Sequence, residues 1–183
     1  VCSLVPDGWK DVPVTDYSGC LVMPGFVDLH AHAPQFSFSG MGMDLQLLDW
    51  LNTYTFPAEA KYSDIHYAKK MYSFFAGKLL DSETTRAVLF GTIHTDSDIL
   101  LADLLEKTGL KIMLGKVNMN RNSIPELTET TEKSLSETER FITALKNYKN
   151  VQPVITPRFV PSCTAELMKG LASIAKKYSL PIQ

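Results

Sequence analysis

The chain has 183 residues, of which 45% are hydrophobic and 21% are charged, and its formal net charge is −2. This composition is that of a globular domain long enough to bury one sizeable core. The charge excludes a strongly basic surface for nucleic acid or anionic membranes, and no apolar run reaches the length of a membrane span. The three cysteines Cys2, Cys20 and Cys163 are scattered, which predicts free thiols in a reducing, cytoplasmic compartment rather than a disulfide framework.

The two ends of the chain have unusual patterns. Residues 1–22 mix Pro, Gly, Asp and Ser with short apolar pairs and show no helical period, so loops and short strands are expected there. The chain begins with Val1 instead of Met and stops at Leu180–Gln183, which has the pattern of a strand opening directly after a helix. A strand cut at that point has backbone groups without partners. We therefore expect a piece of a longer protein.

The main chemical signal is a short apolar segment that is followed by two histidines. A Pro-Gly pair precedes Phe26–Leu29, which is typical of a buried strand. Because residues two apart on a strand point to the same face, His30 and His32 should project together from its end, with Asp28 on the same side. Two imidazoles in this arrangement can bind one Zn²⁺ or Fe²⁺. The pair alone completes no metal site, and this spacing also occurs in proteins without a metal.

A long connection follows the histidines, from Ala33 to about Tyr62. Within it, Leu47 and Leu51 have helical spacing, and Asp44 is a candidate cap for that helix. A segment of this length inside a compact domain is usually functional, although its aromatic residues would also suit simple packing.

The rest of the chain alternates between segments of strand length and amphipathic segments of helix length. Strands are expected at residues 84–93, 111–119, 151–159 and 180–183, and helices at residues 65–80, 98–107, 130–145 and 164–178. This alternation predicts a parallel sheet with covering helices, in the α/β class. An open doubly wound sheet is the alternative, but no Gly-x-Gly-x-x-Gly turn follows the first strand. We therefore expect a (β/α)8 TIM barrel, of which this chain supplies about the first half.

Two prolines conflict with this strand assignment. Pro153 and Pro157 lie within the expected strand at 151–159, and proline is disfavoured in a central strand because it has no N–H for the ladder. A bulge or a short strand would reconcile them with the pattern.

The expected barrel brings several polar side chains to one end. TIM-barrel sites lie at the C-terminal ends of the strands, and His30, His32, His94, Arg158 and Phe159 fall at or near such ends. They are therefore candidates for one shared mouth. The alternatives are ordinary ones: Arg158 in a structural salt bridge, Phe159 in the core, and His94 at the cap of the next helix.

Several motifs in order carry a resemblance to a known family. They are Pro24–His32, Gln35, Leu48–Leu51 with Tyr54–Glu59, Thr92–Ser97 and Thr156–Phe159. From about Leu21 onward, the chain resembles the amidohydrolase superfamily and, within it, the guanine deaminase family. The resemblance implies a barrel of the metal-dependent hydrolase type at residues 23–183. It implies that residues 1–22 are the end of a small β-rich domain that leads into the barrel, whereas the sequence alone fits a disordered lead-in equally well.

The resemblance also implies an activity and roles for individual residues. The reaction would be the hydrolytic deamination of guanine to xanthine and ammonia, in purine catabolism or salvage, by a homodimer with one Zn²⁺ (or Fe²⁺) per subunit. His30 and His32 would be metal ligands, while Gln35, Arg158 and Phe159 would contact the purine. Asp28 would either accept the other N–H of a histidine ring or bond only to backbone.

The remaining parts of such a site would lie on later strands. By resemblance, further histidine ligands, a metal-binding Asp and the Glu that moves protons are expected beyond Gln183, so the fragment alone should be inactive. Another deaminase or chlorohydrolase of the superfamily, acting on a pterin, triazine, adenosine-like or cytosine-like ring, is one alternative, and a non-catalytic barrel scaffold is another. A deaminase acting on nucleic acid is disfavoured, because its His-x-Glu and Cys-x-x-Cys pattern is absent from the sequence.

Overall fold

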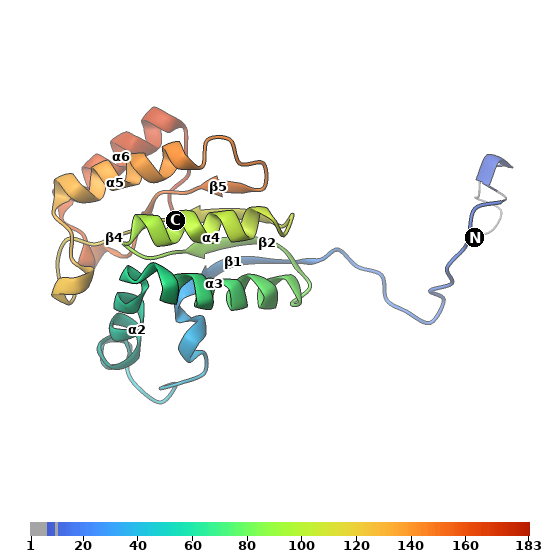
Figure 1. Ribbon diagram of the computed structural model, residues 1–183, viewed down its shortest axis with the longest axis horizontal. Helices are drawn as coiled ribbons and strands as arrows, with labels where there is room; N and C mark the ends of the chain where they lie inside the picture. The colour runs from blue at the N-terminus through green and yellow to red at the C-terminus, as the bar shows by residue number, and fades with distance from the viewer. Residues whose placement is uncertain (1–6, 10) are drawn as a thin grey trace.

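The computed structural model describes residues 7–9 and 11–183. A short turn of 3-10 helix, η2 (Asp7–Trp9), and an exposed segment with no strand at residues 11–25 extend away from the rest of the molecule (Figure 1). The expected short strands are therefore absent from the described part of residues 1–22. The assignment of this region to a β-rich domain stays a prediction. Cys20 and Cys163 are free thiols, as expected, while Cys2 lies outside the described residues.

A parallel sheet lies at the centre of the fold. Its strands are β1 (Phe26–His32), β2 (Thr84–Phe90), β3 (Lys111–Gly115) and β5 (Val151–Pro153). They follow one another in the sheet in the order β1-β2-β3-β5, and all pairs are parallel. The register places His32 beside Phe90 and Phe90 beside Gly115, so the C-terminal ends of the strands lie at one edge.

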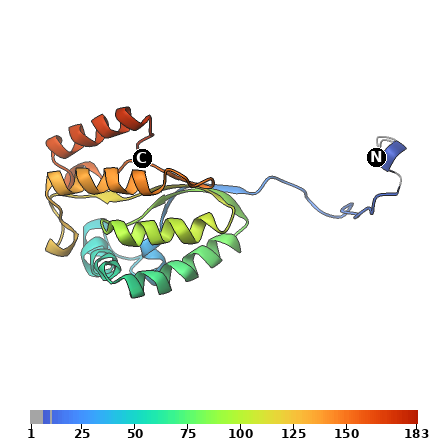
Figure 2. The ribbon, with the colours of Figure 1, turned by 45° about the horizontal axis from the view of Figure 1, so that its top comes forward.

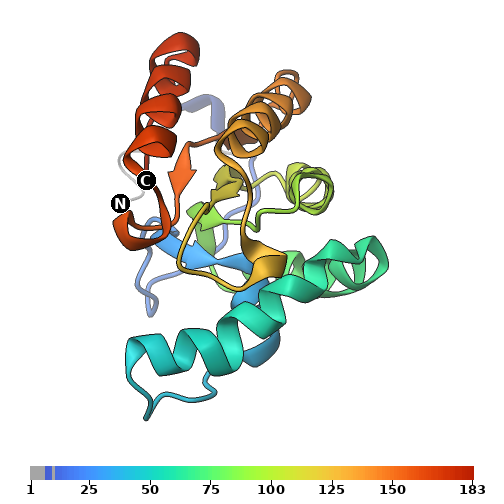
Figure 3. The same cartoon turned by 90° about the vertical axis from the view of Figure 1, so that its left-hand side faces the viewer.

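Four helices connect the strands and cover one face of the curved sheet (Figures 2 and 3). They are α3 (Ile65–Leu80), α4 (Thr95–Glu106), α5 (Thr131–Ala144) and α6 (Ala165–Tyr178). The sequential strand order with helices on one face is the winding of a barrel, because a doubly wound sheet has helices on both faces. The α/β prediction and the partial TIM barrel are therefore confirmed.

Helix starts follow the expected capping chemistry at three of these four helices. Asp64, Thr130 and Thr164 each accept a backbone N–H from the first turn of the helix that follows. Helix α4 instead begins at Thr95, three residues earlier than expected, and its cap position His94 makes no side-chain cap bond. No helix in the described part of the chain is long and apolar enough to cross a membrane.

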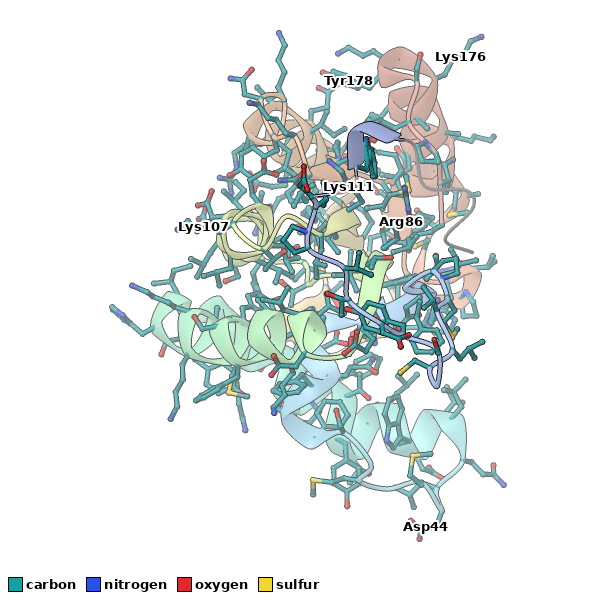
Figure 4. All side chains as sticks on the ribbon, turned by 90° about the vertical axis from the view of Figure 1, so that its right-hand side faces the viewer. Asp44, Arg86, Lys107, Lys111, Lys176 and Tyr178 are labelled. Carbon is teal, nitrogen blue, oxygen red and sulfur yellow. The ribbon has the colours of Figure 1, made fainter. Side chains whose placement is uncertain are left out.

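The connection between β1 and α3 consists mostly of short helical pieces, with turns at residues 39–46. These are η3 (Ala33–Phe38), α1 (Leu47–Trp50), the π-helical turn η4 (Leu51–Thr55), α2 (Phe56–Ala60) and η5 (Lys61–Ser63). The prediction that Asp44 caps the helix was wrong, because α1 begins only after Gln46. A turn closed by the bond from Leu45 N to Gly42 O contains Asp44, which lies at the outer tip of the connection (Figure 4).

The expected strands at 111–119 and 151–159 are each split in two. After β3 the chain continues as β4 (Val117–Asn118), and after β5 as β6 (Thr156–Pro157), and these two short strands pair with each other. Pro153 ends β5 and Pro157 lies in the short strand, so both prolines occur in short strands, as one of the two expected solutions required. Ile182 forms a parallel bridge to Ile155, where the next strand was expected.

Two apolar clusters pack against the central sheet and its C-terminal strand ends. The larger one fills the space between the sheet and helices α3, α4 and α5, and includes Tyr72, Leu89, Leu101, Leu114 and Phe141. The smaller one lies at the C-terminal strand ends and is formed by Leu51, Phe56, Phe90, Ile93, Val117, Met119 and Leu127. The second cluster therefore connects the helical connection after β1 to the ends of β2 and β4.

Candidate active site

The two histidines of the first strand face each other at its C-terminal end. The Nε2 atoms of His30 and His32 lie 3.2 Å apart, and their ring centroids are 5.0 Å apart. Alternation along β1 produces this arrangement, because both residues point to the same side of the strand. Two imidazole nitrogens this close need a proton or a cation between their lone pairs.

The pair fits a metal ion. Two nitrogens bound to one tetrahedral zinc at about 2.0–2.1 Å stand roughly 3.3 Å apart, close to the 3.2 Å observed between the Nε2 atoms. Within residues 7–9 and 11–183, no group of three or more His, Cys, Asp or Glu side chains is arranged to hold a metal. The described chain therefore supplies two ligands of a candidate metal site and needs others to complete it.

The surroundings of His32 keep its ring neutral. Burial, followed in importance by the positive charge of Arg158 and by His30, lowers the pKa of His32 to about 3. The neutral imidazole is the form whose lone pair can bind a metal. Its Nδ1 atom is buried and has no hydrogen-bond partner among the described residues.

Phe90 packs against both imidazoles. Its ring stacks on His32 at a centroid distance of 4.3 Å and an interplanar angle of 20°, and lies 4.9 Å from the ring of His30. No motif in the sequence pointed to this residue. Its position as the last residue of the neighbouring strand, directly beside His32 in the register, is the signal that could have found it.

Asp28 bonds to backbone, which is the second of the two roles expected for it. Its Oδ1 atom accepts the backbone N–H of His30 at 3.0 Å. The carboxylate thus fixes the backbone at the end of β1, and no described bond joins it to a histidine ring.

A buried ion pair borders the histidines. Arg158 follows β6 and donates from Nη1 and Nη2 to the two carboxylate oxygens of Glu59 on α2, with 3.0 Å between Nη2 and Oε1. The two side chains are 4% and 1% exposed, respectively. The ring of Phe56 lies 5.5 Å from the guanidinium carbon. Arg158 is therefore both in a salt bridge and at the site, which the sequence analysis had treated as alternatives.

Gln35 contacts the carboxylate of Glu59 as well. Its amide nitrogen lies 3.5 Å from Oε1 of Glu59, a long hydrogen bond. Glu59 belongs to a motif noted in the sequence, but no role was predicted for it. Its contact with Arg158 spans 99 residues, so no local pattern points to the pairing.

These side chains surround a cleft of about 550 Å³ at the C-terminal ends of the strands. The lining residues are His30, Ala31, His32, Gln35, Leu47, Trp50, Leu51, Phe90, Arg158 and Phe159. All five residues predicted to bind metal or purine are among them. Their binding roles stay predictions.

His94 lies outside this cleft. It lines a separate polar depression with Lys133 and Glu137. Burial, followed by the charges of Lys116 and Lys133, lowers the pKa of His94 to about 4. The expectation that His94 shares the mouth with His30 was wrong, whereas its cap position at α4 is observed without a side-chain bond.

The other end of the sheet offers no comparable chemistry. A depression there is lined by Arg86 and Lys111, which lie close together in Figure 4, and by mostly apolar residues. No described histidine or carboxylate lines it. The cleft beside His30 and His32 is therefore the candidate active site.

Several known proteins are similar to this chain in sequence and in architecture. The guanine deaminase of Rattus norvegicus is 49% identical over 164 residues, which are 88% of this chain and 36% of that protein. A crystal structure of guanine deaminase from C. acetobutylicum with bound guanine in the active site matches with a TM-score of 0.92 and 48% identity, over 98% of this chain and 43% of that one. An adenosine deaminase from Xanthomonas campestris with bound zinc has a TM-score of 0.72 at 17% identity, covering 87% of this chain and 35% of that one, and so shares the fold.

The chain spans little more than a third of the length of the curated relatives it matches. Over residues 21–183 it also matches the model of the Amidohydrolase family. That match begins just before β1 and includes the histidine pair, the connection that carries Glu59, and Arg158. The chain is thus a member of the amidohydrolase family.

Proposed function

We propose that the full-length protein that carries this sequence hydrolyses guanine to xanthine and ammonia. It would be a hydrolase of C–N bonds in a cyclic amidine. The observation that carries the proposal is the single cleft in which His30 and His32 stand beside Gln35, Arg158 and Phe159. The similarity to guanine deaminases, one of them with bound guanine, supports the same substrate.

His30 and His32 would hold one Zn²⁺ per subunit, with Fe²⁺ as the alternative. Such a metal supplies a water that loses its proton near neutral pH and can attack a ring carbon. The chain's own contribution is to keep the lone pair of His32 available, because burial and Arg158 disfavour its protonated form and lower its pKa. Phe90 fixes the ring planes by packing against both imidazoles.

The purine would lie on the other side of the cleft. Two of the five guanidinium N–H groups of Arg158 donate to Glu59, and the other three are left for oxygen or nitrogen acceptors on the ring. Gln35 offers an amide, and the half-buried ring of Phe159 can stack on a flat base. A site of this kind excludes water from one face of the purine and holds its reacting carbon toward the histidines.

The rest of the site would come from outside this chain. Further metal ligands and the carboxylate that moves the proton from water to the leaving nitrogen are expected on later strands, so the isolated 183 residues should be inactive. We also propose, from the family resemblance, that the protein is a homodimer in the cytoplasm and that it acts in purine catabolism or salvage.

The experiment measures ammonia release from guanine by the full-length protein, with adenine, cytosine and a pterin as competing substrates. The variant His30→Ala should lose both bound metal and ammonia release. His66→Ala is the matched control, because His66 is exposed and does not line the cleft. Metal binding without guanine turnover would move the substrate elsewhere in the superfamily, and an absence of bound metal would favour a non-catalytic barrel.

A further inference from the structure

Glu59 lies buried directly behind the polar side chains of the cleft. It is 1% exposed and is not itself a lining residue. Both of its carboxylate oxygens accept from Arg158, and Oε1 also accepts from the amide of Gln35 at 3.5 Å. One carboxylate therefore contacts two of the side chains that face a ligand.

The π-helical turn brings Glu59 to this position. The N–H of Phe56 bonds to the carbonyl of Leu51, five residues earlier. Pro57 has no N–H, so a carbonyl in the preceding turn loses its usual partner and the helix widens. The extra residue places Leu51 and Phe56 on one face, and Glu59 follows three residues later on that face. Leu51 lines the cleft, and Phe56 lies 5.5 Å from the Arg158 guanidinium carbon.

The chemistry of a carboxylate determines how its two partners are oriented. An ionised carboxylate only accepts hydrogen bonds, so the amide nitrogen of Gln35 must face Glu59 and its oxygen is left as an acceptor. Arg158 has no acceptor and keeps three N–H groups as donors. Glu59 thus leaves an acceptor and donors side by side at the cleft.

We propose that Glu59 is a positioning residue that makes the cleft select a ring edge with an N–H next to a C=O. The inference rests on the proposed function, because guanine has such an edge. The acceptor of Gln35 matches the ring N–H, and the donors of Arg158 match the carbonyl oxygen. Without the carboxylate, the amide is free to turn over and the guanidinium loses its two-point support.

The test compares Glu59→Gln with Glu129→Gln in the full-length protein. Glu129 is the matched control, because it is also a buried carboxylate paired with a cation, Lys116, and its described hydrogen bonds reach no residue that lines the cleft. The measurements are the KM and kcat for guanine, the inhibition constant of 2-aminopurine, the metal content and the Tm. 2-Aminopurine lacks the ring N–H and C=O pair of guanine.

Glu59→Gln should raise the KM for guanine at least tenfold, with metal content unchanged and the inhibition constant of 2-aminopurine within twofold of wild type. Glu129→Gln should lower the Tm while its KM stays within twofold of wild type. A KM for Glu59→Gln within twofold of wild type would overturn the inference and leave the proposed function in place. Equal losses of affinity for both purines, or loss of metal, would overturn it as well, since Glu59 would then support only the fold.

Failure of the wild-type protein to release ammonia from guanine would overturn the proposed function, and the inference with it. If Glu59→Gln does not fold, Glu59→Asp is the second variant. It keeps the charge but is one methylene shorter, so it should raise the KM for guanine at least threefold without changing the inhibition constant of 2-aminopurine.

Discussion

The ammonium of Lys116 lies 2.7 Å from Oε2 of Glu129, and both side chains are almost fully buried. Lys116 separates β3 from β4, and Glu129 lies in the loop before α5, where its N–H bonds to Met119 O. The pair therefore ties that loop to the end of the sheet, close to the apolar cluster beneath the cleft.

Removal of Lys116 should be strongly destabilising. Lys116→Ala leaves the Glu129 carboxylate buried without a cation, which costs about 3–5 kcal/mol of unfolding free energy. Urea denaturation measures the change. Lys177→Ala is the control, because it breaks an ion pair with Glu139 at the surface and should have no measurable effect. Equal effects of the two variants would contradict the burial argument.

Loss of the Phe90 ring should weaken metal binding. Phe90→Leu keeps an apolar side chain but removes the flat face that packs on His30 and His32, and we expect about a tenfold loss of metal affinity. Metal titration of the full-length protein measures it. Phe141→Leu is the control, since Phe141 is also buried but belongs to the cluster between sheet and helices. That variant should lose stability and keep its metal affinity.

The neutral ring of His94 should make stability depend on pH. Its pKa falls from 6.5 to about 4 in the fold, mainly through burial. Between these values the unfolded chain binds a proton that the folded chain does not, so stability decreases as the pH falls from about 6.5 to about 4. His94→Gln should reduce this dependence in denaturation at several pH values. An undiminished pH dependence in this variant would contradict the burial argument.

Two glycines should respond in opposite ways to alanine. Gly42 has a φ of +67°, and a Cβ there would lie 2.5 Å from the ring of Tyr54, so Gly42→Ala should cost about 1 kcal/mol or more. Gly77 lies within α3 with no atom within 4 Å of such a Cβ, so Gly77→Ala should stabilise by about 0.5–1 kcal/mol. Thermal denaturation of both variants checks the two signs.

Local patterns in the sequence were the most reliable guide to the fold. The expected helix starts at residues 65, 130 and 164 fall at or beside the observed caps Asp64, Thr130 and Thr164, because a cap and the apolar period that follows are neighbours in the chain. Asp44 looked equally suitable, but a turn closed by Gly42 moved the start of α1 beyond it.

The candidate site was predictable where residues follow a strand and not where they pack from elsewhere. His30, His32 and Arg158 stand at or just after strand ends, which the alternating pattern located. Glu59 and Phe90 escaped detection because their roles depend on tertiary neighbours. The π-helical turn also has no simple period in the sequence, and it decides which face of the helix carries Glu59.

The bond between Glu59 and Arg158 affects when the site can form while the chain is being synthesised. Glu59 leaves the ribosome 99 residues before Arg158, so its carboxylate lacks its cationic partner until Arg158 has been made. The polar side of the cleft can form only after β6 has paired with β4. The binding surface therefore matures only after Arg158 has been made, although its two histidines come much earlier in the chain.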